Sequence, residues 1–249
     1  NSEWIIYTDS SANDSISLYP NIQKHLDQFS KVITSVNKPY GLHRARKKES
    51  FEGEKILALR KCVNRPAFSY VNFDSFVSRA YLIIRTNRVN QKYLTGLLNS
   101  ALIKYWLKYK GKMQGANFQI DKEPLQQIPI AVPAINVQEL IATIVDYVMM
   151  ASSTKENLSE LVSNETIALF FEKIIDGCVY ELYFGEHMKE QEINIIDSAL
   201  ELIKPITHLS SDKEKADMIL DVFMNIKKTD NSIRNRLDLF TLRSPEILK

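Results

Sequence analysis

The sequence predicts an α+β fold for its first half, with a small mixed or antiparallel sheet and flanking helices, followed by an all-α helical domain. Short β-branched and aromatic runs, typical of strands, are concentrated before residue 85. From about residue 136 the apolar residues recur with the helical period of about 3.6 residues. The charge changes sign at the same point: residues 1–135 carry 20 Lys and Arg against 10 Asp and Glu, and residues 136–249 carry 12 against 20. We therefore expect one domain over residues 1–135 and a second over residues 136–249.

The chain begins with short elements. Residues 4–8 are aromatic and β-branched and predict an edge strand. A proline near the helix start, followed by apolar residues at helical spacing, predicts a helix over residues 20–35. Residues 38–53 show no apolar period and predict an exposed loop. Apolar runs then predict strands at residues 56–59 and 67–71.

A buried strand and a long helix follow. Residues 81–84 form an uninterrupted apolar run that predicts the buried strand. An apolar stripe predicts an amphipathic helix over residues 90–109, and its spacing favours core packing over base stacking for Trp106. After the helix we expect a basic turn at residues 110–115 and a short strand and loop over residues 118–130.

The second half predicts helices throughout. Apolar residues keep the helical spacing from residue 140 to residue 226, with breaks near Ser152, Gly185 and Pro205. Strand signals are nearly absent from this half.

The composition is that of an ordinary globular chain. Hydrophobic residues make up 45% and charged residues 25%, which excludes wholesale disorder. No stretch approaches the roughly 18 apolar residues of a membrane span. Two cysteines, Cys62 and Cys178, cannot form a disulfide framework and fit a reducing, cytoplasmic setting. Because the first residue is not Met and no leader follows it, we expect a piece of a longer protein.

No familiar catalytic motif is recognisable in the sequence. The four His and two Cys are scattered and lack zinc-site spacing. The seven Gly form neither a dinucleotide-binding nor a nucleoside-triphosphate-binding pattern. No Asp or Glu is followed two positions later by Lys, which removes the usual carboxylate–lysine pair of metal-dependent nucleases. We therefore predict no catalytic residue, no metal ligand and no cofactor site in this chain.

Positive charge is concentrated in residues 38–65, which hold nine Lys and Arg against three Glu. A basic surface gains affinity for a polyanion because binding releases counterions from the nucleic acid. The first half as a whole has a net charge of +10. This asymmetry favours nucleic-acid binding over a face that is merely solvated.

Several local patterns occur in a fixed order and resemble the TaqI-like C-terminal specificity domain. Two later segments, Gln138-Glu-Leu-Ile141 and Val179-Tyr-Glu-Leu-Tyr183, are similar to segments of type I specificity subunits and of fused restriction–modification enzymes. The patterns that carry the first resemblance are Tyr19-Pro20, Leu42-His-Arg-Ala-Arg46, Lys55-Ile-Leu57, Tyr81-Leu-Ile-Ile84, Tyr93-Leu-Thr-Gly-Leu-Leu-Asn-Ser-Ala-Leu-Ile103, Gly115-Ala-Asn-Phe-Gln-Ile-Asp-Lys-Glu-Pro-Leu125, and Ile128-Pro-Ile130 with Pro133.

The resemblance implies a target-recognition domain that reads double-stranded DNA for an adenine-specific methyltransferase or a fused type IIG restriction enzyme of a bacterium. The family's catalytic domain carries an Asn-Pro-Pro-Tyr motif and an S-adenosylmethionine loop, and neither occurs here. The methyltransferase domain would then lie upstream in the same parent chain. S-adenosylmethionine would be its cofactor, and Mg²⁺ that of any fused nuclease.

Two segments predict the DNA contacts, the loop at residues 43–53 and the turn at residues 110–119. Lysines are suited to phosphates, whereas Arg, Asn and Gln present the planar groups that read base edges. Phe51 is a candidate wedge between bases. The predicted DNA-binding residues are His43, Arg44, Arg46, Lys47, Lys48, Arg65, Lys110, Lys112, Gln114, Asn117 and Gln119.

Structural roles for these side chains stay open. Arg44 and Arg46 are also placed to pair with neighbouring glutamates, namely Glu49, Glu52 or Glu54, and Asn117 and Gln119 to satisfy backbone groups at a turn. Two other function classes stay open as well. A helical scaffold would dock a partner subunit through the acidic half, and an undetected enzyme would turn over a substrate with a metal or cofactor.

Overall fold

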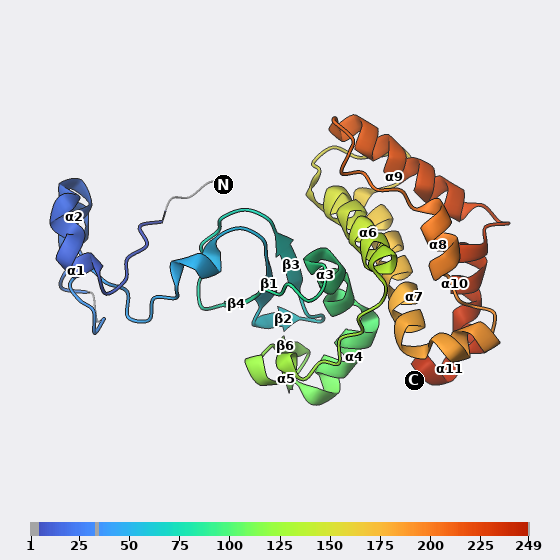
Figure 1. Ribbon diagram of the computed structural model, residues 1–249, viewed down its shortest axis with the longest axis horizontal. Helices are drawn as coiled ribbons and strands as arrows, with labels where there is room; N and C mark the ends of the chain where they lie inside the picture. The colour runs from blue at the N-terminus through green and yellow to red at the C-terminus, as the bar shows by residue number, and fades with distance from the viewer. Residues whose placement is uncertain (1–4, 33–34, 249) are drawn as a thin grey trace. The chain divides into compact units, whose positions relative to one another are not determined.

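The computed structural model describes residues 5–32 and 35–248. The chain divides into two compact units (Figure 1). Unit 1 comprises residues up to 53 together with residues 73–78, and unit 2 comprises residues 54–72 together with residues 79 onward. The predicted fold class is confirmed, because small antiparallel sheets with flanking helices are followed by a mostly helical region.

Unit 1 is organised around three aromatic rings. Tyr7, Phe51 and Phe76 have ring centroids between 4.8 and 5.3 Å apart. The Ser75 amide donates to the Phe51 carbonyl at 2.9 Å, which ties residues 73–78 into the unit. Its helical segments are α1 (Ala12–Ser15), η1 (Ile16–Leu18), α2 (Pro20–Asp27) and η2 (Lys48–Phe51).

The strand predicted at residues 4–8 is wrong for residues 5–8, and Trp4 lies outside the described residues. No strand pairs with this segment among the residues that the structure describes. Instead, the Thr8 hydroxyl donates to the Tyr40 carbonyl at 2.6 Å. A β-branched sequence does not form a ladder without a neighbouring strand to share its hydrogen bonds.

The helix predicted over residues 20–35 is shorter than expected and ends at Asp27. Residues 33–34 lie outside the described part of the chain. Phe29 and Val32, which continue the apolar period, are exposed. Because these apolar side chains are not buried, tertiary packing does not stabilise a longer helix.

Unit 2 contains two three-stranded antiparallel sheets, with strand orders β3-β1-β4 and β2-β6-β5. The strand predictions near residues 56, 68 and 81 are confirmed. The strands are β1 (Lys55–Leu59), β2 (Lys61–Val63), β3 (Phe68–Val71), β4 (Tyr81–Ile84), β5 (Lys112–Gln114) and β6 (Asn117–Gln119).

Two details of the strand predictions need correction. β4 was expected to be buried, but all four of its residues are half-buried, since it lies at the edge of its sheet. The basic turn expected at residues 110–115 is largely strand β5, and the turn itself is reduced to Gly115 and Ala116. Gly115 has φ of +61°, which suits the first position of a two-residue hairpin loop.

The single helix predicted over residues 90–109 is two helices, α3 (Gln91–Asn99) and α4 (Ala101–Lys110). Ser100 separates them with an extended backbone and accepts a hydrogen bond from the Ile103 amide. Asp176 accepts one from the Ala101 amide at 2.7 Å. These two side chains satisfy backbone amides at the start of α4, which stabilises a new helix start at this position. The apolar period alone does not reveal this break.

The helices from residue 135 onward follow the predicted pattern in part. Breaks occur where they were expected, after Ser153, at Phe184 inside a kinked helix, and between residues 203 and 211. Residues 158–162 are not helical, and further breaks lie at residues 191–195 and 228–231. The loop expected before residue 130 contains a short helix, α5 (Lys122–Gln126). The helices are α5 (Lys122–Gln126), α6 (Ile135–Ser153), α7 (Asn164–Glu190), α8 (Ile196–Leu202), α9 (Asp212–Lys227), α10 (Ser232–Arg243) and α11 (Pro245–Leu248). Among the described residues, none of the helices is both long and apolar enough to cross a membrane.

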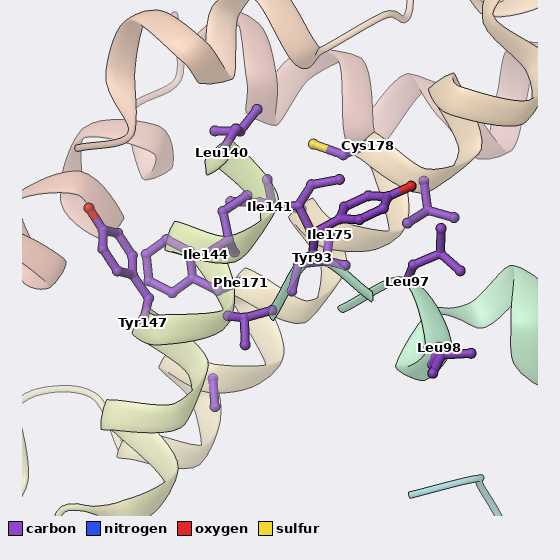
Figure 2. Close-up of a cluster of buried hydrophobic side chains, with 14 of the residues drawn as sticks. Tyr93, Leu97, Leu98, Leu140, Ile141, Ile144, Tyr147, Phe171, Ile175 and Cys178 are labelled. Carbon is purple, nitrogen blue, oxygen red and sulfur yellow. The ribbon is translucent and has the colours of Figure 1, made fainter. Parts of the chain in front are cut away.

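One hydrophobic core extends across residue 135, where the charge changes sign (Figure 2). Helix α3 packs on α6 and α7. At Gly96 a Cβ atom would lie 2.9 Å from Ile141 Cγ2 and 3.0 Å from Val145 Cγ2, so glycine permits the close approach of α3 to α6. Residues on both sides of 135 therefore share one core, and a division of function at that position stays a prediction.

Candidate nucleic-acid interface

The sheet β2-β6-β5 has one buried face and one exposed face. Cys62, Phe118 and Met113 occupy neighbouring register positions on the inner face, where they join the hydrophobic core. Because side chains alternate along a strand, the residues on either side of these three point outward. The outer face thus carries Lys61, Val63, Lys112, Gln114, Asn117 and Gln119.

The strand register arranges the outer face in two rows. The tip row, next to the hairpin loop, is Val63, Asn117 and Gln114. The base row consists of Lys61, Gln119 and Lys112. All six are exposed except Gln119, which is half-buried. The face therefore presents two ammonium groups and three amides without an acidic side chain in either row.

A hydrogen-bond network lies at the end of the base row. Asp121 accepts from Arg60 at 3.0 Å and from Gln119 Nε2 at 3.1 Å, and Lys112 Nζ lies 3.5 Å from it. Desolvation acts to raise the pKa of Asp121, but the hydrogen bonds and the neighbouring cations outweigh it and lower the pKa. Asp121 thus stays ionised and holds Arg60 and Gln119 in place.

The predicted residues of the 110–119 segment are brought together by the structure. Lys112, Gln114, Asn117 and Gln119 lie on the outer face of the sheet, and Lys110 is exposed at the end of α4. Gln114 Nε2 donates to Gln119 Oε1 at 3.3 Å. Whether these residues contact DNA stays a prediction.

Lys61 is a residue of this face that the sequence patterns do not indicate. It lies on the outer face about 50 positions before β5 and β6, paired with Gln119. The pattern polar–apolar–polar occurs in Lys61–Val63 only in part, since Val63 is apolar, but it is clear in Lys112–Gln114 and Asn117–Gln119. That shared alternation is a signal that would have joined β5 and β6, but it does not extend to β2.

Helix α4 adds two exposed tyrosines beside lysines. Tyr105 and Tyr109 are 52% and 62% exposed, and their ring centroids are 4.6 Å apart. Lys108 Nζ lies 5.5 Å from the centre of the Tyr109 ring. Trp106 is half-buried against the core, which confirms core packing for that residue.

The residues predicted from the 43–53 loop belong to unit 1. His43, Arg44, Lys47 and Lys48 are exposed, and Lys48 Nζ lies 4.0 Å from a Glu52 carboxylate oxygen. Arg46 is half-buried and directs Nη2 to the Ser78 carbonyl at 3.5 Å. These positions leave the first four side chains accessible to a phosphate.

Three members of the basic segment have structural environments that the sequence did not reveal. Lys55 is fully buried in β1, so it adds no charge to the surface. Arg65 donates to Glu172 at 2.9 Å. Phe51, the candidate wedge, is 2% exposed within the aromatic cluster of unit 1, so the wedge prediction is wrong.

A cavity of about 590 Å³ lies in unit 2, lined by β3, by the junction of α3 and α4, and by α6 and α7. The Arg65–Glu172 pair and Asp176 are among its lining residues. Burial raises the pKa of Asp176 to about 6, against an ordinary value of 3.8, and the hydrogen bond from the Ala101 amide only partly offsets it. In the part of the chain that the structure describes, no group of three His, Cys, Asp or Glu side chains is arranged to hold a metal ion.

The raised pKa of Asp176 predicts a pH-dependent loss of stability. The pKa of Asp176 is higher in the folded state than in the unfolded state, so only the folded state keeps the proton between about pH 4 and 6. The free energy of unfolding therefore falls as the pH rises through this window, and it stays lower above it. Asp176→Asn keeps an oxygen for the Ala101 amide and removes the charge. We expect the variant to be more stable than the wild type at pH 7.5 by up to about 3 kcal/mol, with a difference that shrinks toward pH 4. Urea unfolding at both pH values measures this, and a pH-independent difference would contradict it.

Two comparisons with known proteins bear on this chain, and the first includes the part that holds the sheet β2-β6-β5. Residues 14–130 match the TaqI-like C-terminal specificity domain. A protein of Methanocaldococcus jannaschii, provisionally named as a type II restriction enzyme and methyltransferase, is 30% identical over 192 residues. That alignment covers 73% of this chain and 15% of the relative, so the chain spans a small part of the relative's length. The relative is archaeal, so it gives no support to the bacterial origin that the motifs implied.

Proposed function

Because residues 14–130 match the TaqI-like C-terminal specificity domain, we propose that this chain recognises duplex DNA sequence-specifically for a restriction–modification protein. The recognised duplex would be positioned for an adenine-methylating domain of the same parent chain. S-adenosylmethionine would bind in that domain, and Mg²⁺ in any fused nuclease. Such a protein would act in the cytoplasm, where the cell's DNA is.

The observation that carries the proposal is the outer face of the sheet β2-β6-β5. Its amides can donate and accept in one plane, which is the geometry that base edges require. Its lysines, together with Lys110, supply the charges that bind phosphates and fix the register of a protein on the duplex. The rows hold no carboxylate that would repel the DNA backbone.

The acidic residues after 136 are assigned a different role. A net charge of −8 opposes contact with a polyanion, so we propose that these helices dock the methyltransferase part of the parent protein. A scaffold that binds only a partner subunit through the same helices is the alternative function. The two differ in whether the chain alone binds DNA.

Fluorescence anisotropy with a random duplex of about 30 base pairs, titrated across salt, tests the proposal. We expect binding whose log affinity falls with log salt by about 0.9 for each phosphate neutralised. Arg44→Gln, Lys47→Gln and Lys48→Gln, made together, show whether unit 1 contributes to that slope. A folded chain that does not bind DNA at low salt would contradict the proposal and favour the scaffold.

A further inference from the structure

We infer that the tip row of the sheet β2-β6-β5 reads an adenine–thymine pair in the major groove, with Gln114 contacting the adenine. This inference rests on the proposed DNA recognition and names the base pair that this site selects. It starts from the composition of the row. Val63, Asn117 and Gln114 are uncharged and exposed, whereas the neighbouring base row carries the two lysines.

The position of the tip row suits a groove. β5 and β6 form the hairpin of the three-stranded sheet β2-β6-β5, with its two-residue loop at Gly115, and a Cβ atom placed on Gly115 meets nothing within 4 Å. The major groove is about 12 Å wide and admits a two-stranded ribbon. Neighbouring strands are about 4.8 Å apart, so the three side chains of the row span about 10 Å. When the tip row faces the base edges, the lysines of the base row lie two residues further along the strands, on the side of the phosphates.

The amide of Gln114 is oriented by a chain of hydrogen bonds. Asp121 accepts from Gln119 Nε2, which turns the Gln119 oxygen toward Gln114. Gln114 Nε2 then donates one hydrogen to that oxygen. Gln114 is exposed, and among the described residues its second Nε2 hydrogen and its Oε1 atom have no hydrogen-bond partner.

This remaining pair of groups matches adenine. In the major groove adenine presents an N7 acceptor beside an N6 donor, and a glutamine amide meets both at once. Guanine presents two acceptors and is best met by arginine, but Arg60 and Arg65, which flank β2, are paired with Asp121 and Glu172. Val63 is 69% exposed in the same row and supplies an apolar surface for the thymine methyl group.

Selection from a library of duplexes with a randomised central segment tests the inference. The wild-type chain is expected to enrich sites that contain a fixed adenine–thymine pair. Gln114→Ala should lose the preference at that position, so that discrimination falls from about 10- to 100-fold to about 1-fold, and leave the other positions unchanged. Gln114→Glu should replace the adenine with cytosine, whose N4 group donates to a carboxylate.

Lys61→Gln is the matched control on the same face. It should weaken binding to all duplexes about equally and leave the selected sequence unchanged, as a phosphate contact does. If the wild type enriches a sequence that neither Gln114 variant alters, or if the altered position is not adenine–thymine, the inference is overturned while the proposed function stands. If the wild type binds DNA but enriches no sequence, both are overturned.

Discussion

Replacing Lys61, Lys110 and Lys112 together by Gln is expected to weaken binding to a random duplex by about 10²- to 10³-fold at 0.1 M salt. Three phosphate contacts contribute about 2.7 to the slope of log affinity against log salt. At 0.1 M salt, relative to 1 M, this corresponds to a contribution of about 500-fold to the affinity. All three side chains are exposed, so their loss leaves the core intact. Anisotropy titrations at several salt concentrations measure the affinity and the slope together.

The acidic half offers a control with the same change in charge. Lys189, Lys213 and Lys228 are exposed lysines on the helices or at their ends. Replacing these three by Gln should lower the slope by much less than the first variant does. Equal losses from both triple variants would show that the net charge of the chain, and not the sheet face, governs DNA binding.

Phe171→Ala is expected to lower the free energy of unfolding of unit 2 by about 3–5 kcal/mol. Phe171 is fully buried in α7, with its ring 5.0 Å from that of Tyr147 on α6 (Figure 2). Removing the ring leaves a cavity in the core that α3 also shares. The strands and α4 should therefore be destabilised together with the helices of the acidic half.

Two probes separate a shared core from independent domains. In a Trp4→Phe background, the only tryptophan is Trp106 on α4, so its fluorescence reports the basic half, whereas far-ultraviolet circular dichroism reports mainly the long helices. Both urea transitions should coincide and shift together in the Phe171→Ala variant. Leu169→Ala, on the same helix but 52% exposed, should shift either transition by less than about 0.5 kcal/mol. A fluorescence transition unmoved by Phe171→Ala would show that the halves unfold separately.

The sequence by itself determined most local elements and the resemblance to the specificity domain. Alternation and apolar runs located β1, β3 and β4, and helical spacing located the helices after residue 135, because each pattern records which side of one element is buried. The ordered motifs from Tyr19 to Pro133 indicated the specificity domain, which the match over residues 14–130 confirms. Local patterns failed where the apolar side chains stay exposed, as at Phe29 and Val32 beyond α2.

Only the tertiary structure decided which site residues lie together and which charges reach the surface. Lys61 joins Gln119 and Lys112 because β2 pairs with β6, a partner more than 50 positions away. Lys55 and Arg65 belong to the basic segment, but Lys55 is buried and Arg65 is paired with Glu172. The physical reason is that periodicity shows which side chains share a face of a strand. Which strands pair with one another depends on burial and hydrogen bonding between residues far apart in the sequence.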